Sequence, residues 1–328
     1  MKNHALKTLV AASILASSCL LCGEVLARDV KIPNTLALDN PINVGLKAFA
    51  EEVASKTNGD LTFTIIPNGV LGGDQELISQ CLGGMLEAIA VGGLNAFQQQ
   101  VPAMAIDNLP FMFKTAEEAY KAYDGAFGEA LNSKIEPLGL KKVTFLEHGF
   151  RQITNNRKEV RSPDDLKGLK MRVPPVDIRV QTFKALGANP IPLPLPELFT
   201  ALQQNAVDAE ENPLTTILSM KFNEVQKYVT ISNHIHDTGV LYFNKNFWDS
   251  LSPEYQKIVL EAGEVAKQAS RVAGESADRD GIAKLKEYGN VVTVLTDDEH
   301  KAFVEAVQPV WDSFIEKYGD AELKLLGK

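Results

Sequence analysis

The sequence lacks the motifs that mark most enzyme active sites. It contains no G-x-S-x-G elbow, no H-E-x-x-H pair, no phosphate-binding glycine loop and no G-x-G-x-x-G after a strand. His234 and His236 would face the same side of a strand, and His148 could add a third ligand, but this spacing matches no established metal site. We therefore expect no catalytic residue, no metal and no cofactor, and we expect His234 and His236 to bond to backbone or solvent.

Positive charge is also scarce. The chain has 33 Lys and Arg residues against 42 Asp and Glu residues, which gives a net charge of −9. Phosphate backbones and anionic lipid surfaces repel such a protein, so the sequence excludes nucleic acid and anionic membrane surfaces as partners. The same field would oppose the binding of a small anion. An anionic ligand would therefore need a local cluster of arginines.

Apolar runs are short apart from one near the N-terminus. Lys2 and Lys7 flank the start of an apolar stretch over residues 9–21, and Val25-Leu26-Ala27 supplies small or apolar residues where a signal peptidase cleaves. A stretch this short, with these flanks, is typical of a secretory signal and not of a membrane span. We expect cleavage after Ala27 and a location in the periplasm.

Cysteine is nearly absent from the expected mature chain. Cys19 and Cys22 belong to the signal, where lipid attachment at one of them is the alternative to simple cleavage. Cys81 then remains alone, so an internal disulfide is excluded and stability must come from packing. We expect Cys81 to be a small buried residue in a helix.

What the sequence does contain is an alternation of short apolar runs with helical patterns, which favours an α/β fold. Residues 61–66, 74–81 and 86–91 predict a strand, a helix and a strand. A second unit of this kind begins with a strand over residues 168–173 and a helix over residues 177–186. The 301 residues left after cleavage allow two domains of about 150 residues each.

Two helices are predicted near the C-terminus. Ser252-Pro253-Glu254 opens a helix, and a proline-free apolar stripe continues it to Tyr288. A helix of about 35 residues is about 50 Å long, which exceeds the width of one lobe, so it should lie across both. A capping box from Thr296 to Glu299 predicts a final helix that runs towards Tyr318.

Two arginines stand near the ends of predicted strands. Arg172 lies on the strand over residues 168–173, and Arg151 follows a strand over residues 142–147 through a predicted turn, His148-Gly149-Phe150. Ligands of open α/β sheets bind beyond the carboxyl ends of strands. A guanidinium group can form two parallel hydrogen bonds with a carboxylate. Together these arginines predict a carboxylate site, although either one alone would be read as a solvated surface charge.

Several blocks of the sequence resemble the solute-binding proteins of TRAP transporters, of the DctP type. The resemblance runs in order through nearly the whole mature chain. The blocks are GFRQITN (149–155), DLKGLKMRVP (165–174), FKALGANP (183–190), ENP (211–213), KFNEVQKY (221–228) and NKNFW (244–248).

The resemblance implies a two-lobe periplasmic-binding-protein fold of the α/β class, with a ligand cleft between the lobes and one long helix spanning both. We expect residues 28–149 plus about 235–275 to form lobe I, and residues 150–234 plus about 276–328 to form lobe II. The implied function is to close on a small organic-acid anion and deliver it to the membrane permease subunits, without catalysis. We expect a monomer that does not itself span the membrane.

The resemblance also implies roles for individual residues. The arginine at Arg172 bridges the ligand carboxylate, the arginine at Arg151 assists, and Asn212 lies beside them. The acidic residue at Glu76 reaches ligand hydroxyls from the other lobe. The remaining expected ligand-binding residues are Phe150, Asn95, His236 and Asp237.

The sequence departs from the family pattern at residues 234–238. Many relatives have His-x-Tyr-Ser-Pro there, whereas this chain has His-Ile-His-Asp-Thr. His236 and Asp237 therefore either meet the far end of the ligand or serve the hinge.

The number of acceptors near the expected cleft favours a polyhydroxylated acid, such as a uronate or an aldonate. A ligand with two carboxylates would need a second basic cluster, and none is evident. A C4-dicarboxylate or a keto acid remains the alternative ligand. Two alternatives come from other classes: a secreted sugar-acid enzyme with Glu76, His236 or Asp237 as its base, and a binding module of a signalling receptor.

Overall fold

The computed structural model describes residues 28–328. The expected signal peptide, with its cleavage site and both cysteines considered for lipid attachment, lies outside the described residues. In chain order the strands are β1 (Arg28–Pro33), β2 (Leu61–Ile66), β3 (Ala88–Val91), β4 (Leu140–Asn155), β5 (Lys170–Val173), β6 (Asn189–Pro192), β7 (Ala209–Pro213), β8 (Tyr228–Ile231), β9 (His236–Asn244) and β10 (Val291–Val294).

Helices alternate with these strands, as the sequence predicts. The α-helices are α1 (Pro41–Lys56), α2 (Asp74–Leu82), α3 (Ala116–Tyr123), α4 (Ala126–Ile135), α5 (Asp177–Ala185), α6 (Leu195–Gln203), α7 (Leu214–Ser219), α8 (Lys245–Ser250), α9 (Pro253–Glu287), α10 (Asp297–Ala306), α11 (Gln308–Tyr318) and α12 (Ala321–Lys324). Short 3-10 helices are η1 (Leu94–Gln99), η2 (Pro102–Asn108), η3 (Glu136–Leu138), η4 (Pro163–Leu166) and η5 (Phe222–Glu224).

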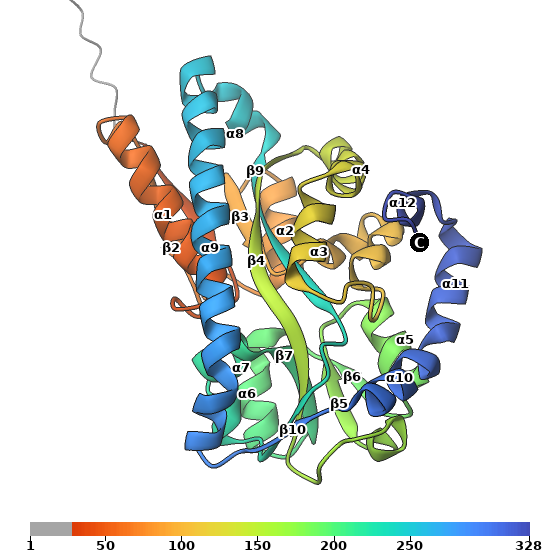
Figure 1. Ribbon diagram of the computed structural model, residues 1–328. Helices are drawn as coiled ribbons and strands as arrows, with labels where there is room; N and C mark the ends of the chain where they lie inside the picture. Colours follow the sequence, from red (N-terminus) through yellow and green to blue (C-terminus); the bar gives the residue numbers. More distant parts are fainter. Residues whose placement is uncertain (1–27) are drawn as a thin grey trace, which may run out of the picture.

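The long strand β4 belongs to both lobes. Its residues 140–150 pair antiparallel with β9, which in turn pairs with β3 in the first lobe. Its residues 151–155 pair with β7, and the last of them also pair with β8 in the second lobe. The second sheet is completed by β10, β5 and β6, and Figure 1 shows β4 running from one lobe into the other. The strand that carries Arg151 therefore passes through the hinge.

The predicted turn at His148-Gly149-Phe150 is wrong, because β4 continues through it. A register shift between Glu147 and Gly149 accommodates the extra residue. Gly149 has a φ of +115°, which only glycine adopts without strain. A β-bulge, and not a turn, redirects the strand just before Arg151.

The predicted helix across both lobes is confirmed as α9. It begins behind Ser252, whose Oγ accepts a hydrogen bond from the backbone N–H of Tyr255 at 3.1 Å, with Pro253 as the first helical residue. Along its length α9 contacts α1 and β4 and then α7 and β10, and Figure 1 shows it lying against both lobes. The single C-terminal helix expected after Thr296 is instead two, α10 and α11. They separate at Val307 because Pro309, in the first turn of α11, cannot continue the hydrogen bonds of α10.

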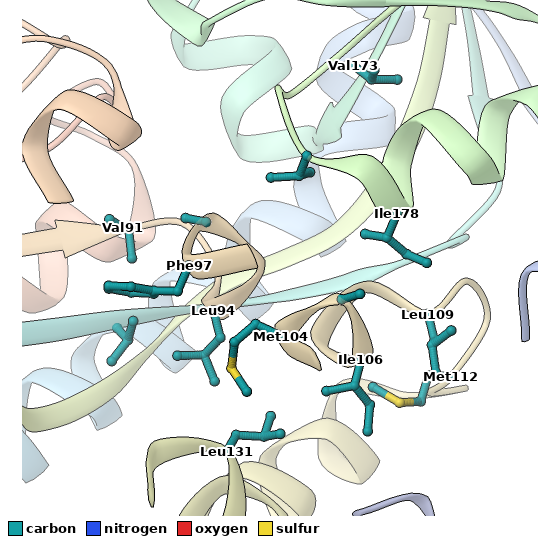
Figure 2. Close-up of a cluster of buried hydrophobic side chains, with 14 of the residues drawn as sticks. Val91, Leu94, Phe97, Met104, Ile106, Leu109, Met112, Leu131, Val173 and Ile178 are labelled. Atoms are coloured by element: carbon teal, nitrogen blue, oxygen red, sulfur yellow. The ribbon is translucent and has the colours of Figure 1, made fainter. Parts of the chain in front are cut away.

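Apolar side chains gather into separate cores on the two sides of the cleft. One core contains residues of α1, β1 and β9, such as Phe49, Ile32 and Phe243, and another contains residues of α6 and α7. The largest core brings η1 and η2 against α5, and Figure 2 shows Phe97 and Met104 of this cluster with Ile178. Cys81 is buried in it, as expected, and burial raises the pKa of its thiol to about 12.

A close contact of α1 with α9 depends on a glycine, which gives a first prediction. A Cβ at Gly45 would lie 2.7 Å from the backbone oxygen of Ala266. Alanine is the better helix former by about 1 kcal/mol. Even so, we expect Gly45→Ala to lower the free energy of unfolding by about 1–2 kcal/mol, because two backbones must separate.

Urea unfolding measures this change. Val44→Ala is the control, because Val44 lies one residue away on the exposed face of α1 and should change stability by less than about 0.5 kcal/mol. An unchanged or higher unfolding midpoint for Gly45→Ala would show that the two helices are not in tight contact.

Candidate functional site

A cavity of about 310 Å³ lies between the lobes, which is a size that suits a small organic molecule. Residues of three regions line it. The first lobe supplies the loop after β1, the start of α2 and the segment after β3. The second lobe supplies the end of β5, the start of α5, the segment before α6 and Asn212 of β7. The crossing strands β4 and β9 supply His148, Arg151 and Asp237 between them.

Arg172 is the lining arginine whose charge the protein leaves unpaired. It stands near the end of β5, just before Pro174 and Pro175, as the sequence predicts. Its Nε donates a 2.8 Å hydrogen bond to the carbonyl of Leu193, and its terminal nitrogens have no hydrogen-bond or salt-bridge partner within residues 28–328. Burial lowers the pKa of this guanidinium to about 10, so it stays charged at neutral pH. A ligand carboxylate is the group that such a site can accept.

Arg151 also lines the cavity, but its charge is compensated within the protein. Its Nε and one Nη bind the carboxylate of Glu211, and its other Nη lies 2.7 Å from Asp237 Oδ2. The Nη that binds Glu211 also donates to Asn212 Oδ1 at 3.1 Å. Arg151 can therefore contribute to the potential in the cavity while few of its donors remain for a ligand.

A third lining arginine, Arg179 on α5, was not identified from the sequence. Its two Nη atoms lie 2.6 Å from Glu211 Oε2 and 2.7 Å from Asp237 Oδ1, and its Nε donates to Asn108 Oδ1 at 2.8 Å. Its side chain is fully buried. A charged residue in the first turn of a predicted helix is normally solvated, and only the tertiary fold brings this one to the two carboxylates.

Glu211 and Asp237 together hold Arg151 and Arg179 in place. Burial acts to raise the pKa of both carboxyl groups, but the two arginines outweigh it, so the pKa of each lies below its ordinary value. His234 Nε2 also lies 3.0 Å from Glu211 Oε2. Two negative charges thus balance two positive ones, and the charge of Arg172 is left for a ligand.

Acidic side chains of the first lobe face Arg172 across the cavity. Asp74 and Glu76 lie in the first turn of α2 and line the cavity, with Asp74 partly buried and Glu76 exposed. Thr35 Oγ1 donates a 3.0 Å hydrogen bond to Asp74 Oδ1. Burial raises the pKa of Asp74 to about 6, against the opposing effects of Thr35 and Arg172. The family resemblance implies Glu76, whereas Asp74 is indistinguishable in the sequence from an ordinary acidic residue at the start of a helix.

The other expected site residues divide into two groups. Asn95 and Asn212 line the cavity, and the amide of Asn212 is already used by Arg151 and by Glu210. Asp237 lines it too, bound by Arg151, Arg179 and Asn108. Phe150 and His236 do not line it.

His236 lies in a separate buried cluster beneath α9. Its Nε2 is 3.2 Å from Glu147 Oε1, and its ring meets Phe150 edge-on with 4.9 Å between centroids. Burial, with Glu147 as the second cause, raises the pKa of nearby Asp278 to about 7. The contact between His236 and the far end of a ligand is thus not supported by its position. Asp237 lines the cavity, whereas His236 lies outside the cavity lining, near Glu147, Phe150 and Asp278.

The expectation that His234 and His236 bond to backbone or solvent is wrong, because their neighbours are side chains: Glu211 and Ser232 for His234, and Glu147 for His236. His148 Nδ1 lies 3.0 Å from the carbonyl of Gly92, and burial lowers its pKa to about 4. His234 and His236 instead face carboxylates. No group of three side chains suited to hold a metal occurs in the part of the chain that the structure describes. None of the helices between residues 28 and 328 combines the length and the hydropathy needed to cross a bilayer.

The molecule has two α/β lobes, one helix that spans both, and an interlobe cavity with one unpaired buried arginine. These features define a solute-binding protein of the two-lobe class. The family model described as bacterial extracellular solute-binding protein, family 7 (DctP) matches residues 33–317. The chain belongs to this family, whose members are non-enzymatic binding proteins of transporters.

Individual relatives agree over most of the chain. The 2,3-diketo-L-gulonate-binding periplasmic protein of Escherichia coli (strain K12) is 35% identical over 274 residues, which cover 83% of this chain and 83% of that protein. The sugar acid binding protein of Advenella mimigardefordensis strain DPN7T, solved in complex with galactonate, superposes with a TM-score of 0.88 at 34% identity and covers 91% of this chain and 96% of its own. A TRAP periplasmic solute-binding protein of Sulfurospirillum deleyianum DSM 6946, solved with bound succinate, superposes with a TM-score of 0.87 at 30% identity. The superposition covers 91% of this chain and 98% of that one.

The buried ion network predicts how stability depends on pH. The pKa of Glu211 is lower in the folded protein than its ordinary value of 4.5, so its ionised form stabilises the fold above about pH 4.5 and this contribution is lost as the pH falls further. We expect Glu211→Gln to lower the free energy of unfolding at pH 7 by about 3–5 kcal/mol, because two buried arginines would then share one carboxylate.

Urea unfolding of the ligand-free protein at pH 7, 5.5, 4 and 3 measures this effect. The difference between wild type and Glu211→Gln should shrink below pH 4.5. Glu287→Gln, at an exposed position near the end of α9, should behave like the wild type at every pH. A Glu211→Gln variant as stable as the wild type at pH 7 would contradict the role given to this carboxylate.

Proposed function

We propose that this chain binds the carboxylate of a sugar acid, such as an aldonate or a uronate, on Arg172 in the interlobe cavity. The observation that carries the proposal is the unpaired guanidinium of Arg172, faced across the cavity by the acidic side chains of α2. A carboxylate would neutralise the arginine, and ligand hydroxyls would donate hydrogen bonds to Asp74 and Glu76. Galactonate in one similar structure and 2,3-diketo-L-gulonate in the name of a relative support this ligand class.

The wider setting of this function is part of the same proposal. We propose that residues 1–27 are a signal peptide cleaved after Ala27, that the mature chain works in the periplasm as a monomer, and that it passes its ligand to TRAP permease subunits. The division into lobe I (residues 28–149 plus about 235–275) and lobe II (residues 150–234 plus about 276–328) also belongs to it. The name of the Escherichia coli relative supports the location, and the family supports the transport partner.

A C4-dicarboxylate is the second candidate, because one similar structure holds succinate. The charges in the cavity disfavour it. Arg151 and Arg179 are already paired with Glu211 and Asp237, so a second carboxylate would find no unpaired arginine and would face Asp74 and Glu76. The cavity thus offers acceptors, not cations, to the far end of the ligand.

Replacing Arg172 tests the anchor. We expect Arg172→Ala to weaken the binding of galactonate by about 2–5 kcal/mol, because the ligand carboxylate would be buried without a partner. Arg172→Lys should also bind much more weakly than wild type, because a single ammonium cannot form two parallel hydrogen bonds. Titration calorimetry measures both. Arg279→Ala, which removes an exposed arginine of α9, is the control and should bind normally. Wild-type affinity in either Arg172 variant would refute the assignment.

Replacing Asp74 distinguishes the two ligand classes. Asp74→Asn keeps the shape of the side chain and removes its charge. We expect it to weaken galactonate by about 1–2 kcal/mol, through the loss of a charge-assisted hydrogen bond, and to strengthen succinate, through the loss of like-charge repulsion. Calorimetry with both acids at pH 7.5 gives the two signs in one experiment. A wild-type protein that binds succinate more tightly than galactonate would favour the dicarboxylate reading.

A further inference from the structure

Two short segments that border the cavity, one from each lobe, are in contact with each other. The first is the loop Gly69–Gly73 that joins β2 to α2. The second is Pro194-Leu195-Pro196, which comprises the residue before α6 and the first two residues of α6. A Cβ at Gly69 would lie 2.5 Å from Pro196 Cγ, and a Cβ at Gly73 would lie 3.5 Å from Pro194 Cβ. The two segments are thus in direct contact, and we call them together the latch.

The side of the latch in the first lobe is held rigidly. The N–H of Asn68 donates to the carbonyl of Leu36 at 2.9 Å, and the N–H of Gly69 donates to the carbonyl of Asn34 at 2.9 Å. Gly69 has a φ of +65° and Gly72 a φ of +121°, so the loop uses conformations that favour glycine. These bonds fasten the loop to the segment after β1 that lines the cavity.

The side of the latch in the second lobe carries an apolar contact. Leu195 is partly buried and lines the cavity. It packs against the apolar core of α1, β1 and β9 in the first lobe and also against the core of α6 and α7 in its own lobe. Separation of the lobes would expose this side chain, so its burial favours the closed state.

The latch is also connected to the anchor for the ligand. Arg172 Nε donates to the carbonyl of Leu193, and the N–H of Leu193 donates to the carbonyl of Val173 at 3.0 Å. The guanidinium that the proposed function assigns to the carboxylate therefore also fixes the backbone next to Pro194. A bound carboxylate would orient Arg172 and, through it, the segment that meets Gly69.

We propose that the latch, with Leu195 as its central residue, sets how long the closed protein retains its ligand. This inference rests on the proposed binding of an organic acid in the cavity, but not on which acid it is. Latch residues position the lobes and stabilise the closed state, while Arg172 supplies the charge. Weakening the latch should therefore speed release of the ligand and leave its association rate nearly unchanged.

Two glycine substitutions separate the latch contact from backbone strain. Gly69→Ala places a methyl group against the stiff ring of Pro196. Gly59→Ala is the matched control, because Gly59 also has a positive φ, of +84°, and a Cβ there would meet nothing within 4 Å. We expect Gly69→Ala to release galactonate about tenfold faster and to raise its Kd by the same factor, as a tenfold smaller closed population requires. Gly59→Ala should match the wild type in both.

A double variant tests the contact itself. In Gly69→Ala/Pro196→Ala the ring that the new methyl group would strike is gone, so this protein should bind no more weakly than Pro196→Ala alone. Leu195→Ala leaves the backbone unchanged and should also release the ligand faster, which gives a second route if Gly69→Ala does not fold. Equal release rates for wild type, Gly69→Ala and Leu195→Ala, or additive losses in the double variant, would overturn the proposal.

The choice of probe keeps this test separate from that of the proposed function. If galactonate does not bind the wild type, the sugar-acid proposal fails and the same variants are measured with succinate. If neither acid binds, spin labels at Met85→Cys and Lys167→Cys, two exposed positions on opposite lobes, report the distance between the lobes, since Cys81 is buried and does not react. The latch then predicts a longer mean distance in Gly69→Ala than in wild type and Gly59→Ala, and equal distances would refute it.

Discussion

The burial of guanidinium groups is the constraint on which the rest of this structure depends. Burial lowers the pKa of Arg172 and of Arg179, and the nearby charge of Arg151 lowers both further. A buried charge is costly unless it is paired and hydrogen-bonded. Glu211 and Asp237 each bind both Arg151 and Arg179, which satisfies two of the three. The crossing strands, the bulge at Gly149 and the start of α5 are arranged to bring these groups together.

The same network explains how an acidic protein can attract an anion. The net charge of the chain is −9, so its distant field opposes such a ligand. Solvent ions screen exposed charges beyond about 10 Å, whereas charges inside a cavity interact with little screening. At the short distances inside the cavity, the ion pairs of Arg151 and Arg179 contribute little to the electrostatic potential. The unpaired charge of Arg172 contributes most of the attraction for an anion. Asp74 and Glu76 then act as acceptors for the other end of the ligand, because they lie on the opposite lobe.

The sequence could predict features that depend on one segment of the chain, but not features that depend on contacts between residues far apart in it. The helix α9 was predictable because Ser252, Pro253 and the long apolar stripe are read within one segment, and Arg172 because its strand ends at prolines. Arg179 was not, because its partners Glu211 and Asp237 are 32 and 58 residues away in the chain. The bulge at Gly149 looked like a turn for the same reason: only pairing with β9 shows that the strand continues. His236 was misplaced because a strand pattern gives the alternation of faces but not which face meets the cavity.

Ligand recognition and closure share one side chain in this molecule. Arg172 turns its terminal nitrogens to the cavity and its Nε to the carbonyl of Leu193, so the position of the anchor and the position of the segment before α6 cannot change independently. Arg172 has no salt bridge within residues 28–328, although Glu211, Glu210 and Asp74 lie near enough for their charges and that of Arg172 to influence one another. A carboxylate on the terminal nitrogens would compensate the charge of Arg172 inside the cavity, and this favours the state in which both lobes contact the ligand. The anchor for the ligand and the latch therefore stabilise the closed state through the same side chain.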